Sequence, residues 1–225
     1  HTGAWIPRRT LAAAFQEEFF DAPHLAEPTV PTDAGSSRRE AYRALKGRVL
    51  RQEVFAEDGA GNLSHLYTIT EQGYAVVALQ PDAFRVDEIR TRSSAYDQPV
   101  GEATDPRVQD SLVLETDTYG TPLRTATIAY PRRGTGHEAE QLALHVVVQQ
   151  VEVIHQDDRV VTDDLWRLGL PARQRSWELR DPPAWTDESP PSAATVDTAI
   201  GEGELRPLSE ERTTYATDEI GRAHV

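Results

Sequence analysis

The sequence predicts an all-β fold, in which antiparallel strands and hairpins form a broad curved sheet accompanied by two or three short helices. Beyond residue 48 the chain alternates between β-branched segments and clusters of Gly, Pro, Asp and Asn, a pattern typical of strands and turns. Hydrophobic residues make up 38% and charged residues 27%, which favours thin layers with wetted faces over one thick core. The segment Ala172–Arg180 has no face apolar enough for a buried sandwich, so it indicates a sheet solvated on one side.

Two helices are expected before the strands begin. Thr10 is placed to cap a helix over Leu11–Phe20, and the Pro-, Asp- and Thr-rich residues 21–35 indicate a loop. Residues 37–40, Ser-Arg-Arg-Glu, have the form of a capping box, in which the Ser and Glu side chains each bond a backbone amide of the first helical turn. Gly47 suits the left-handed position that follows a helix, so the second helix is expected to end there.

The remaining segments are predicted to be strands, one further helix and loops. The predicted strands are Arg48–Ala56, Leu66–Thr70, Tyr74–Gln80, Arg85–Ala95, Leu112–Thr116, Leu123–Tyr130, Leu142–His155, Ala172–Arg180 and Leu208–Thr217. Residues 117–122, Asp-Thr-Tyr-Gly-Thr-Pro, give the clearest hairpin signal. Thr162 is expected to cap a helix over Asp163–Leu168 that Gly169 and Pro171 close. Residues 181–193 contain four prolines and indicate a loop.

Length and charge limit what the protein does. The 225 residues suffice for one large or two small domains, and we expect a lead-in helix and loop over 1–35 and a β-rich domain over 36–225. The chain lacks Met and starts at His1, so it is expected to be part of a longer or processed protein. A net charge of −14 disfavours binding to nucleic acid or to anionic membranes. No apolar run approaches the roughly 20 residues of a membrane-spanning helix, and no Cys is present to form disulfides or thiolate metal sites.

The histidines do not predict a metal site. His145 and His155 lie on one predicted strand, where ten residues separate them by roughly 33 Å, too far to share a metal ion. The sequence His137-Glu138 begins like a zinc-protease motif but lacks the second His four residues on. We therefore expect no metal and no bound cofactor.

No catalytic residues are predicted either. A Gly-x-Ser-x-Gly elbow is absent, and Gly59-Ala60-Gly61 lacks the third glycine and the helix of a phosphate-binding loop. Adjacent acids such as Asp157-Asp158, Asp163-Asp164 and Glu210-Glu211 fall in loops or at element ends, where solvated charge is the ordinary role. A glycosidase with a pair of carboxylates remains an alternative. The four tryptophans leave a second alternative, a carbohydrate- or receptor-binding β-module; they are Trp5, Trp166, Trp177 and Trp185.

Local sequence adds a family resemblance. Residues 41–59, with Arg-Ala-Leu-Lys-Gly followed by Leu-Arg-Gln-Glu-Val-Phe, resemble a helix-to-strand segment of the middle region of insecticidal Tc toxin B components. Tyr67–Gln72 is similar to the family's "PYTVTEQ", and Asp105–Arg107 to its "DPRI". Further similar segments occur in family order at His1–Trp5, Leu112–Tyr130, Asp163–Pro171 and Leu208–Ala216.

The resemblance implies a structural role without catalysis. In that family the B component and the C component (the Rhs-type cargo protein) build a hollow shell of β-hairpin repeats around the cytotoxic end of C, and B docks onto the pore-forming A component. A segment between the β-propeller and the Rhs repeats is expected to form shell wall in a secreted toxin assembled in the bacterial cytoplasm. The hairpin at Asp117–Gly120 resembles a relaxed Tyr-Asp repeat turn. Nothing matches the aspartyl protease of the C component, so no catalytic residue is implied.

Overall fold

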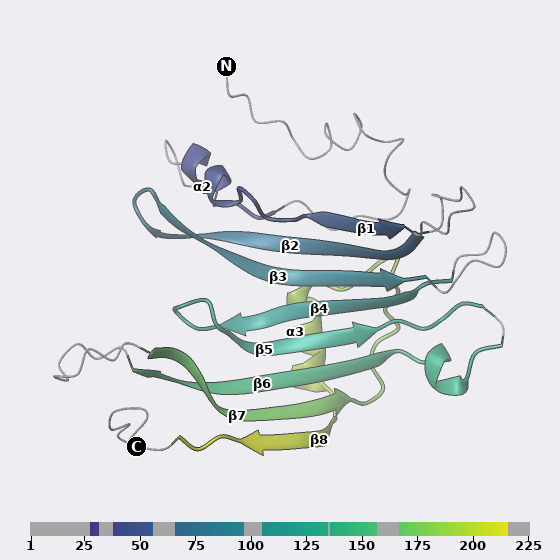
Figure 1. The fold of residues 1–225 in the computed structure, drawn as a ribbon. Coiled ribbons are helices and arrows are strands. Elements are labelled where there is room, and N and C mark those ends of the chain that lie inside the picture. Colours follow the sequence, from purple (N-terminus) through teal and green to yellow (C-terminus); the bar gives the residue numbers. More distant parts are fainter. Residues whose placement is uncertain are drawn as a thin grey trace. The chain divides into compact units, whose positions relative to one another are not determined.

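The chain forms one eight-stranded sheet whose strands follow one another in sequence order, β1 to β8 (Figure 1). The computed structural model describes residues 28–31, 38–55, 66–96, 105–134, 136–156 and 167–215. The elements are α2 (Arg38–Ala44), β1 (Arg51–Phe55), β2 (Leu66–Gln80), β3 (Ala83–Ala95), β4 (Arg107–Thr116), β5 (Pro122–Ala129), the 3-10 helix η2 (Ala139–Leu142), β6 (His145–Gln156), β7 (Arg167–Leu179), α3 (Ala193–Glu202) and β8 (Leu205–Arg212). The predicted all-β class, with mainly antiparallel strands and short helices, is confirmed.

Two compact units make up the chain. The first draws on His1–Ser111, Ala129–Leu144 and Thr186–Pro190, and the second on Leu112–Ile128, His145–Trp185 and Pro191–Val225. Their buried side chains differ in kind. The first unit buries charged residues beside apolar ones, whereas the buried side chains of the second are almost all apolar.

The helix predicted to precede the first strand is present as α2. Its Ala41 is fully buried, and its exposed face carries an ion pair between Glu40 and Arg43 at 3.1 Å. Gly47 has the left-handed φ of +83° that the sequence indicated, but the helix ends earlier than predicted, at Ala44, and residues 45–47 form a turn. The following strand, β1, is shorter than the predicted 48–56. The predicted capping Ser37 and the predicted helix 11–20 lie outside the described residues.

The predicted break near Gly73 is wrong, because β2 continues through it. The ladder to the antiparallel β3 shifts register between Gly73, which pairs with Arg90, and Tyr74, which pairs with Glu88. Such a bulge inserts one residue without ending the strand. It also changes which alternate residues are buried, from Ile69 and Glu71 before the bulge to Tyr74 and Val76 after it.

In the second unit, α3 was not predicted from the sequence. The Ser192 side chain caps it by accepting a hydrogen bond from the Thr195 amide at 3.1 Å. Val196 and Ile200, four residues apart, are its buried residues. The helix lies across the strands of this unit on one face (Figure 1). Val146, Val148 and Leu179 of the same unit are also buried. An ion pair at 2.5 Å joins Asp197 to Arg124 of β5.

The predicted helix over 163–168 is wrong where it can be compared. Arg167 and Leu168 already belong to β7, and Gly169 and Pro171 continue that strand instead of closing a helix; residues 163–166 lie outside the described residues. The strand tolerates Gly169 at a φ of +70° because glycine has no Cβ. A register shift lies nearby, between Glu152 and Val153 of the β6 partner.

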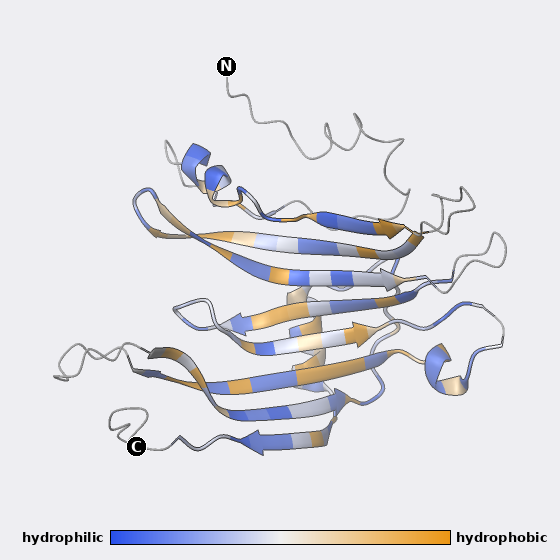
Figure 2. Cartoon of the chain, in the orientation of Figure 1, coloured by the Kyte–Doolittle hydropathy of each residue, from blue (hydrophilic) through white to orange (hydrophobic). Residues whose placement is uncertain are grey.

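The last strand, β8, begins and ends earlier than the predicted 208–217. Almost all of its residues are exposed, and β7 and β8 are largely hydrophilic in Figure 2 while β6 carries long hydrophobic stretches. Pro207 lies at a register shift opposite Trp177. Proline cannot donate to a ladder, so it is found on edge strands and at bulges such as this one. The predicted strand therefore exists as a polar edge.

A matched pair of glycine substitutions tests the packing of α3. A Cβ on Gly203 would lie 2.5 Å from Leu179 Cδ1 and 2.8 Å from the Ala199 carbonyl, although its φ of −92° suits any residue. Gly203→Ala is expected to destabilise the protein by about 1–3 kcal/mol through overpacking. Gly201→Ala has open space around it and is expected to stabilise by about 0.5–1 kcal/mol through helix propensity. Urea unfolding followed by circular dichroism measures both; equal effects of the two variants would contradict this packing.

Candidate functional site: a buried row of charges

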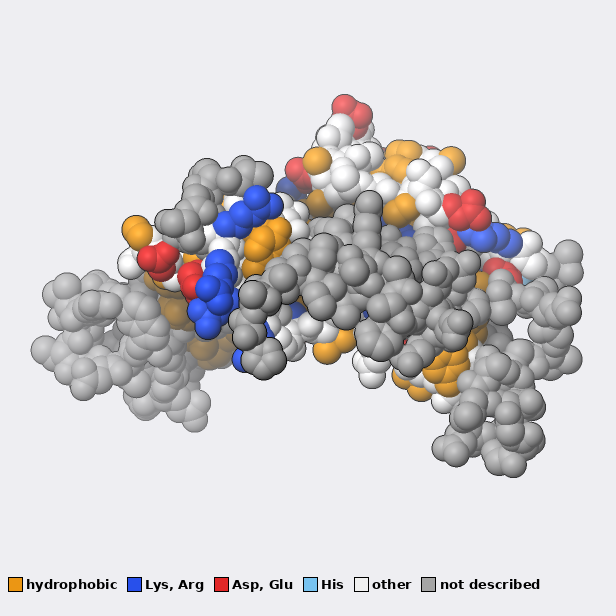
Figure 3. Space-filling view, turned by 90° about the horizontal axis from the view of Figure 1, so that it is seen from above, with side chains coloured by type: hydrophobic (Ala, Val, Ile, Leu, Met, Phe, Trp, Pro, Cys, Tyr) orange, Lys and Arg blue, Asp and Glu red, His pale blue; other side chains and the backbone are white. Residues whose placement is uncertain are grey.

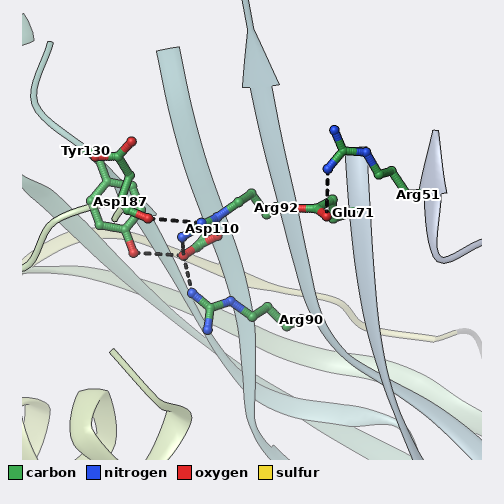
Figure 4. Close-up of polar contacts among 7 residues, drawn as sticks. All are labelled: Arg51, Glu71, Arg90, Arg92, Asp110, Tyr130 and Asp187. Carbon is green, nitrogen blue, oxygen red and sulfur yellow. Dashed lines mark hydrogen bonds and ion pairs between the residues drawn. The ribbon is translucent and has the colours of Figure 1, made fainter. Parts of the chain in front are cut away.

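Charges alternate along a row that runs across neighbouring strands of the first unit. Arg51 of β1 is the register partner of Glu71 of β2, and Glu71 is the register partner of Arg92 of β3. The Arg51 and Glu71 side chains are 3.1 Å apart. Figure 4 shows Arg92 extending from Glu71 toward Asp110 of β4. Register partners lie directly opposite each other, so strand pairing places these residues of opposite charge side by side.

Asp110 is the centre of this row. Its side chain is fully buried, and its two oxygens accept hydrogen bonds from Arg92 at 2.8 and 2.9 Å. Arg90 donates a further bond to Oδ2, and the Tyr130 hydroxyl donates another at 2.7 Å (Figure 4). Arg92 also donates to the backbone carbonyl of Asp187 at 3.0 Å, which ties residues 186–190 to the same cluster. The carboxylate is therefore surrounded by donors from several segments.

The cluster is balanced in charge. Three arginines (Arg51, Arg90 and Arg92) meet three carboxylates (Glu53, Glu71 and Asp110). Charge balance matters because an unpaired buried ion is strongly destabilising, whereas a fully paired and hydrogen-bonded one is tolerated. We name these six residues, with Tyr130, the charge row.

The charge row is built for cohesion and not for proton transfer. Burial acts to raise the pKa of Asp110, but the hydrogen bonds and charges of Arg92 and Arg90 outweigh it and hold the pKa below its ordinary value. Burial and the Asp110 charge raise the pKa of Tyr130, so the phenol remains a donor. A general acid or base needs a pKa near the working pH and access to its substrate. Asp110 has neither.

A second carboxylate, Asp105, organises the loop after β5. It accepts hydrogen bonds from the backbone amides of Arg133 and Gly134 at 3.1 and 2.8 Å, and from the side chains of Arg132 at 3.3 Å and His137 at 2.9 Å. Burial acts to raise the pKa of Asp105, yet these hydrogen bonds lower it to about 2. The carboxylate thus acts as a fixed anion that binds Arg132, Arg133, Gly134 and His137.

In the second unit, the predicted hairpin turn is confirmed, and a histidine of β6 contacts it. Asp117 Oδ1 accepts from the amides of Tyr119 and Thr121, both at 2.8 Å, and Gly120 takes a φ of +88°. His155 Nε2 lies 2.8 Å from Asp117 Oδ2, and its ring centroid lies 4.8 Å from that of Tyr119. The turn is therefore tied to β6.

The histidines that the sequence singled out do not meet. His137 contacts Asp105, His145 lies 3.4 Å from Glu178, and His155 contacts Asp117. Among the described residues, no group of three or more His, Cys, Asp or Glu is placed to hold a metal ion. Nor is any helix there long and apolar enough to cross a membrane.

The other candidates take ordinary surface roles or lie outside the described residues. Glu210 pairs with Arg173 and Arg212 on the exposed strand edge. Trp177 is half-buried beneath the Arg175 guanidinium, 5.4 Å from its ring, and Trp185 is also half-buried. The candidates outside the described residues are Trp5, Gly59–Gly61, Asp157–Asp158, Asp163–Asp164 and Trp166. On the face seen in Figure 3, basic and acidic side chains lie interspersed.

Comparison with known proteins identifies the fold and the family. Residues 40–170 match the family model described as "Insecticide toxin TcdB middle/C-terminal region", which is more than half of the chain. The chain belongs to this family. No curated protein sequence matches the chain.

Two solved structures contain a region with the same fold as this TcdB-type segment. The structure described as "Crystal Structure of TcdB2-TccC3 without hypervariable C-terminal region" aligns with 93% of the chain and 11% of its own, at 20% identity and a TM-score of 0.70. "Crystal Structure of TcdB2-TccC3-TEV" aligns with 75% of the chain and 9% of its own, at 21% identity and a TM-score of 0.58. The TcdB-type segment thus spans about a tenth of each matched chain.

Two family-like sequence segments now have physical roles. Asp105, in the segment that resembles "DPRI", is the anion that binds the backbone amides of Arg133 and Gly134. Asp117, in the hairpin segment, bonds the amides of its own turn. The charge row itself was not predicted. Its one sequence signal is weak: the charged residues Glu71 and Asp110 lie within β-branched segments.

Asp110→Asn tests the charge row. The substitution keeps the shape but leaves Arg90 and Arg92 facing a neutral amide, so we expect a loss of about 3–5 kcal/mol in unfolding free energy. Glu40→Gln is the control, because its pair with Arg43 is exposed and contributes about 0–1 kcal/mol. Urea denaturation of both variants decides the matter. A loss from Asp110→Asn no larger than the control's would show that the row does not hold the strands.

Asp105 gives an expected pH dependence. Its folded-state pKa of about 2 lies below the ordinary 3.8, so its stabilisation is complete above about pH 5 and is lost as pH falls toward 2. The lowering of the pKa corresponds to about 2.4 kcal/mol, which solvent screening of the partly exposed carboxylate reduces to about 1–2 kcal/mol. Unfolding free energies measured from neutral to acidic pH should show a larger acid loss in the unmodified protein than in Asp105→Asn. Parallel curves for the two proteins would contradict this role.

Proposed function

We propose that the chain is a non-catalytic wall segment of the B component of an insecticidal toxin complex. In this role it forms part of the hollow shell that encloses the cytotoxic region of the C component. The observation that carries the proposal is the match of 93% of the chain to a tenth of a TcdB2-TccC3 chain. A fragment that small, with the fold of a continuous sheet, is what a section of a larger β-wall would be.

The open sheet supports this reading. β1 and β8 end the strand order, and neither has a partner strand on its outer side within the described residues. Val54 and Phe55 of β1 are 44% and 38% exposed. Unpaired edges invite further strands. In a longer chain, neighbouring wall segments would supply them.

The interior chemistry supports it as well. A wall needs fixed strand registers, and the charge row favours them through ion pairs that join β1 to β2 and β3 to β4. The buried carboxylates of Glu71 and Asp110 form ion pairs with arginines, which suits a structural role better than catalysis. The domain division proposed with it is a lead-in over 1–35 and a wall domain over 36–225.

The partners proposed for the parent protein follow from the same role. The C component would share the shell, and the A component would receive the assembled pair as its pore-forming subunit. The complex would be secreted after assembly in the bacterial cytoplasm. With a net charge of −14 the segment would contact neither nucleic acid nor the membrane interior.

Protease protection of the cargo tests the wall role. The parent protein is co-expressed with its C component, and the complex is treated with trypsin. Val148 is 2% exposed and its neighbour Gln149 is exposed on the same strand. Val148→Asp buries a charge and is expected to open the wall, so the cargo is digested. Gln149→Asp is the matched control and should leave the cargo intact.

Deletion of residues 41–180 extends the same experiment. Size-exclusion chromatography reports whether B and C still associate in each variant. If the deleted complex assembles and protects its cargo as well as the intact one, the wall role is wrong. Loss of protection in both Asp variants would show only that strand β6 tolerates no charge, and the deletion then decides.

A further inference from the structure

His155 is held at both of its ring nitrogens. Nε2 lies 2.8 Å from Asp117 Oδ2 in the β4–β5 turn. Nδ1 lies 3.0 Å from the backbone nitrogen of Gly169, near the start of β7. The ring is 20% exposed, and Asp117 is 11% exposed. The single side chain thus connects the turn, β6 and β7 within the second unit.

The geometry settles the protonation state of the ring. A backbone N–H can only donate, so Nδ1 must present its lone pair to Gly169 and carries no proton. The proton of the neutral imidazole is then on Nε2, which donates it to the Asp117 carboxylate. Only the neutral tautomer with hydrogen on Nε2 makes both contacts.

We propose that His155 is a pH-sensitive latch that ties the start of β7 to the β4–β5 turn while it is neutral and releases Gly169 when a proton enters at Nδ1. The second proton places an N–H against the Gly169 N–H, and two donors cannot share a hydrogen bond. The contact with Asp117 survives, because protonation turns that hydrogen bond into an ion pair. The latch therefore opens on one side only.

The surrounding groups favour such a response. Asp117 faces the ring from the turn and is ionised: burial acts to raise its pKa, but the amides of Thr121 and Tyr119 outweigh it and hold the pKa below the ordinary value. Tyr119 faces the ring from the same turn. From β7 the ring meets the backbone N–H of Gly169.

Gly169 is suited to being released. Its φ of +70° is a conformation that other residues rarely adopt, so the direction of its N–H depends on a local backbone geometry peculiar to glycine. The other two histidines in the described part of the chain lie beside carboxylates: His145 is 3.4 Å from Glu178 and His137 is 2.9 Å from Asp105.

Hydrogen exchange at the Gly169 amide tests the latch in the 225-residue chain. Exchange is followed by NMR from about pH 7.5 to about pH 5, the range in which an imidazole ordinarily titrates. After correction for the intrinsic pH dependence of exchange, we expect protection of Gly169 to fall roughly tenfold, as for the loss of one hydrogen bond. The ¹⁵N shifts of the His155 ring, recorded on the same samples, give its tautomer and its titration.

Two variants separate the latch from a general loss of structure. In His155→Asn the amide oxygen takes the place of Nδ1 and accepts from Gly169 without titrating, so protection should become independent of pH. His145→Asn removes a histidine of the same unit and should leave the response of Gly169 unchanged. If either variant does not fold, the measurements on the unmodified chain decide alone. Constant protection of Gly169 through the titration of the ring, or a proton on Nδ1 at neutral pH, would overturn the proposal.

Discussion

A buried carboxylate is stable only when hydrogen-bond donors surround it. Asp110 of the first unit is such a carboxylate, so the strands that supply its donors must be correctly placed. Its partners come from β3, from the residue after β5 and, through Arg92, from the 186–190 segment. Each partner requires its own strand to lie in one register. A slip of one residue in β3 would turn Arg90 and Arg92 to the opposite face and leave Asp110 without its arginine partners in the interior. Alternative registers are therefore penalised far more severely here than in an apolar sheet, where a slip exchanges one hydrophobic contact for another.

The second unit achieves its order by other means. Its buried face is apolar, with Ile128, Val146 and Val148 inside and α3 lying across the strands. Its ion pairs, such as Arg173 with Glu210 and Arg175 with Glu152, are on exposed strand faces where solvent screens them. These pairs solubilise an edge and contribute little to stability. One sheet thus combines two ways of specifying register, one by buried charge and one by burial of apolar area beneath a helix.

The sequence predicted the element types well where the signal is local. The hairpin at 117–122 has turn residues whose own side chain closes the turn, and Gly47 has the conformation its position indicated. The helix prediction over 163–168 rested on a capping residue, a glycine and a proline, which are the residues that usually begin and end a helix. Arg167 and Leu168 are instead in a strand, because this part of the chain pairs with β6. α3 was missed although Ser192, Val196 and Ile200 carry its cap and its buried spacing, because its residues between are small and weakly patterned. The charge row could not be predicted, since its pairings join residues about 20 positions apart through registers that no single strand reveals.

The strictly sequential strand order has a consequence for how the chain reaches its native state. Each strand pairs with the one made just before it, from β1 to β8, so the loops that must close are short and the entropy lost at each addition is small. The sheet can therefore grow strand by strand during synthesis on the ribosome, with each completed strand serving as the template for the next. The Asp110 cluster is the exception: it stays incomplete until residues 186–190 arrive, after β4 to β7 have been made. The buried polar cluster of the early strands is therefore completed only after a segment near the end of the chain has been synthesised.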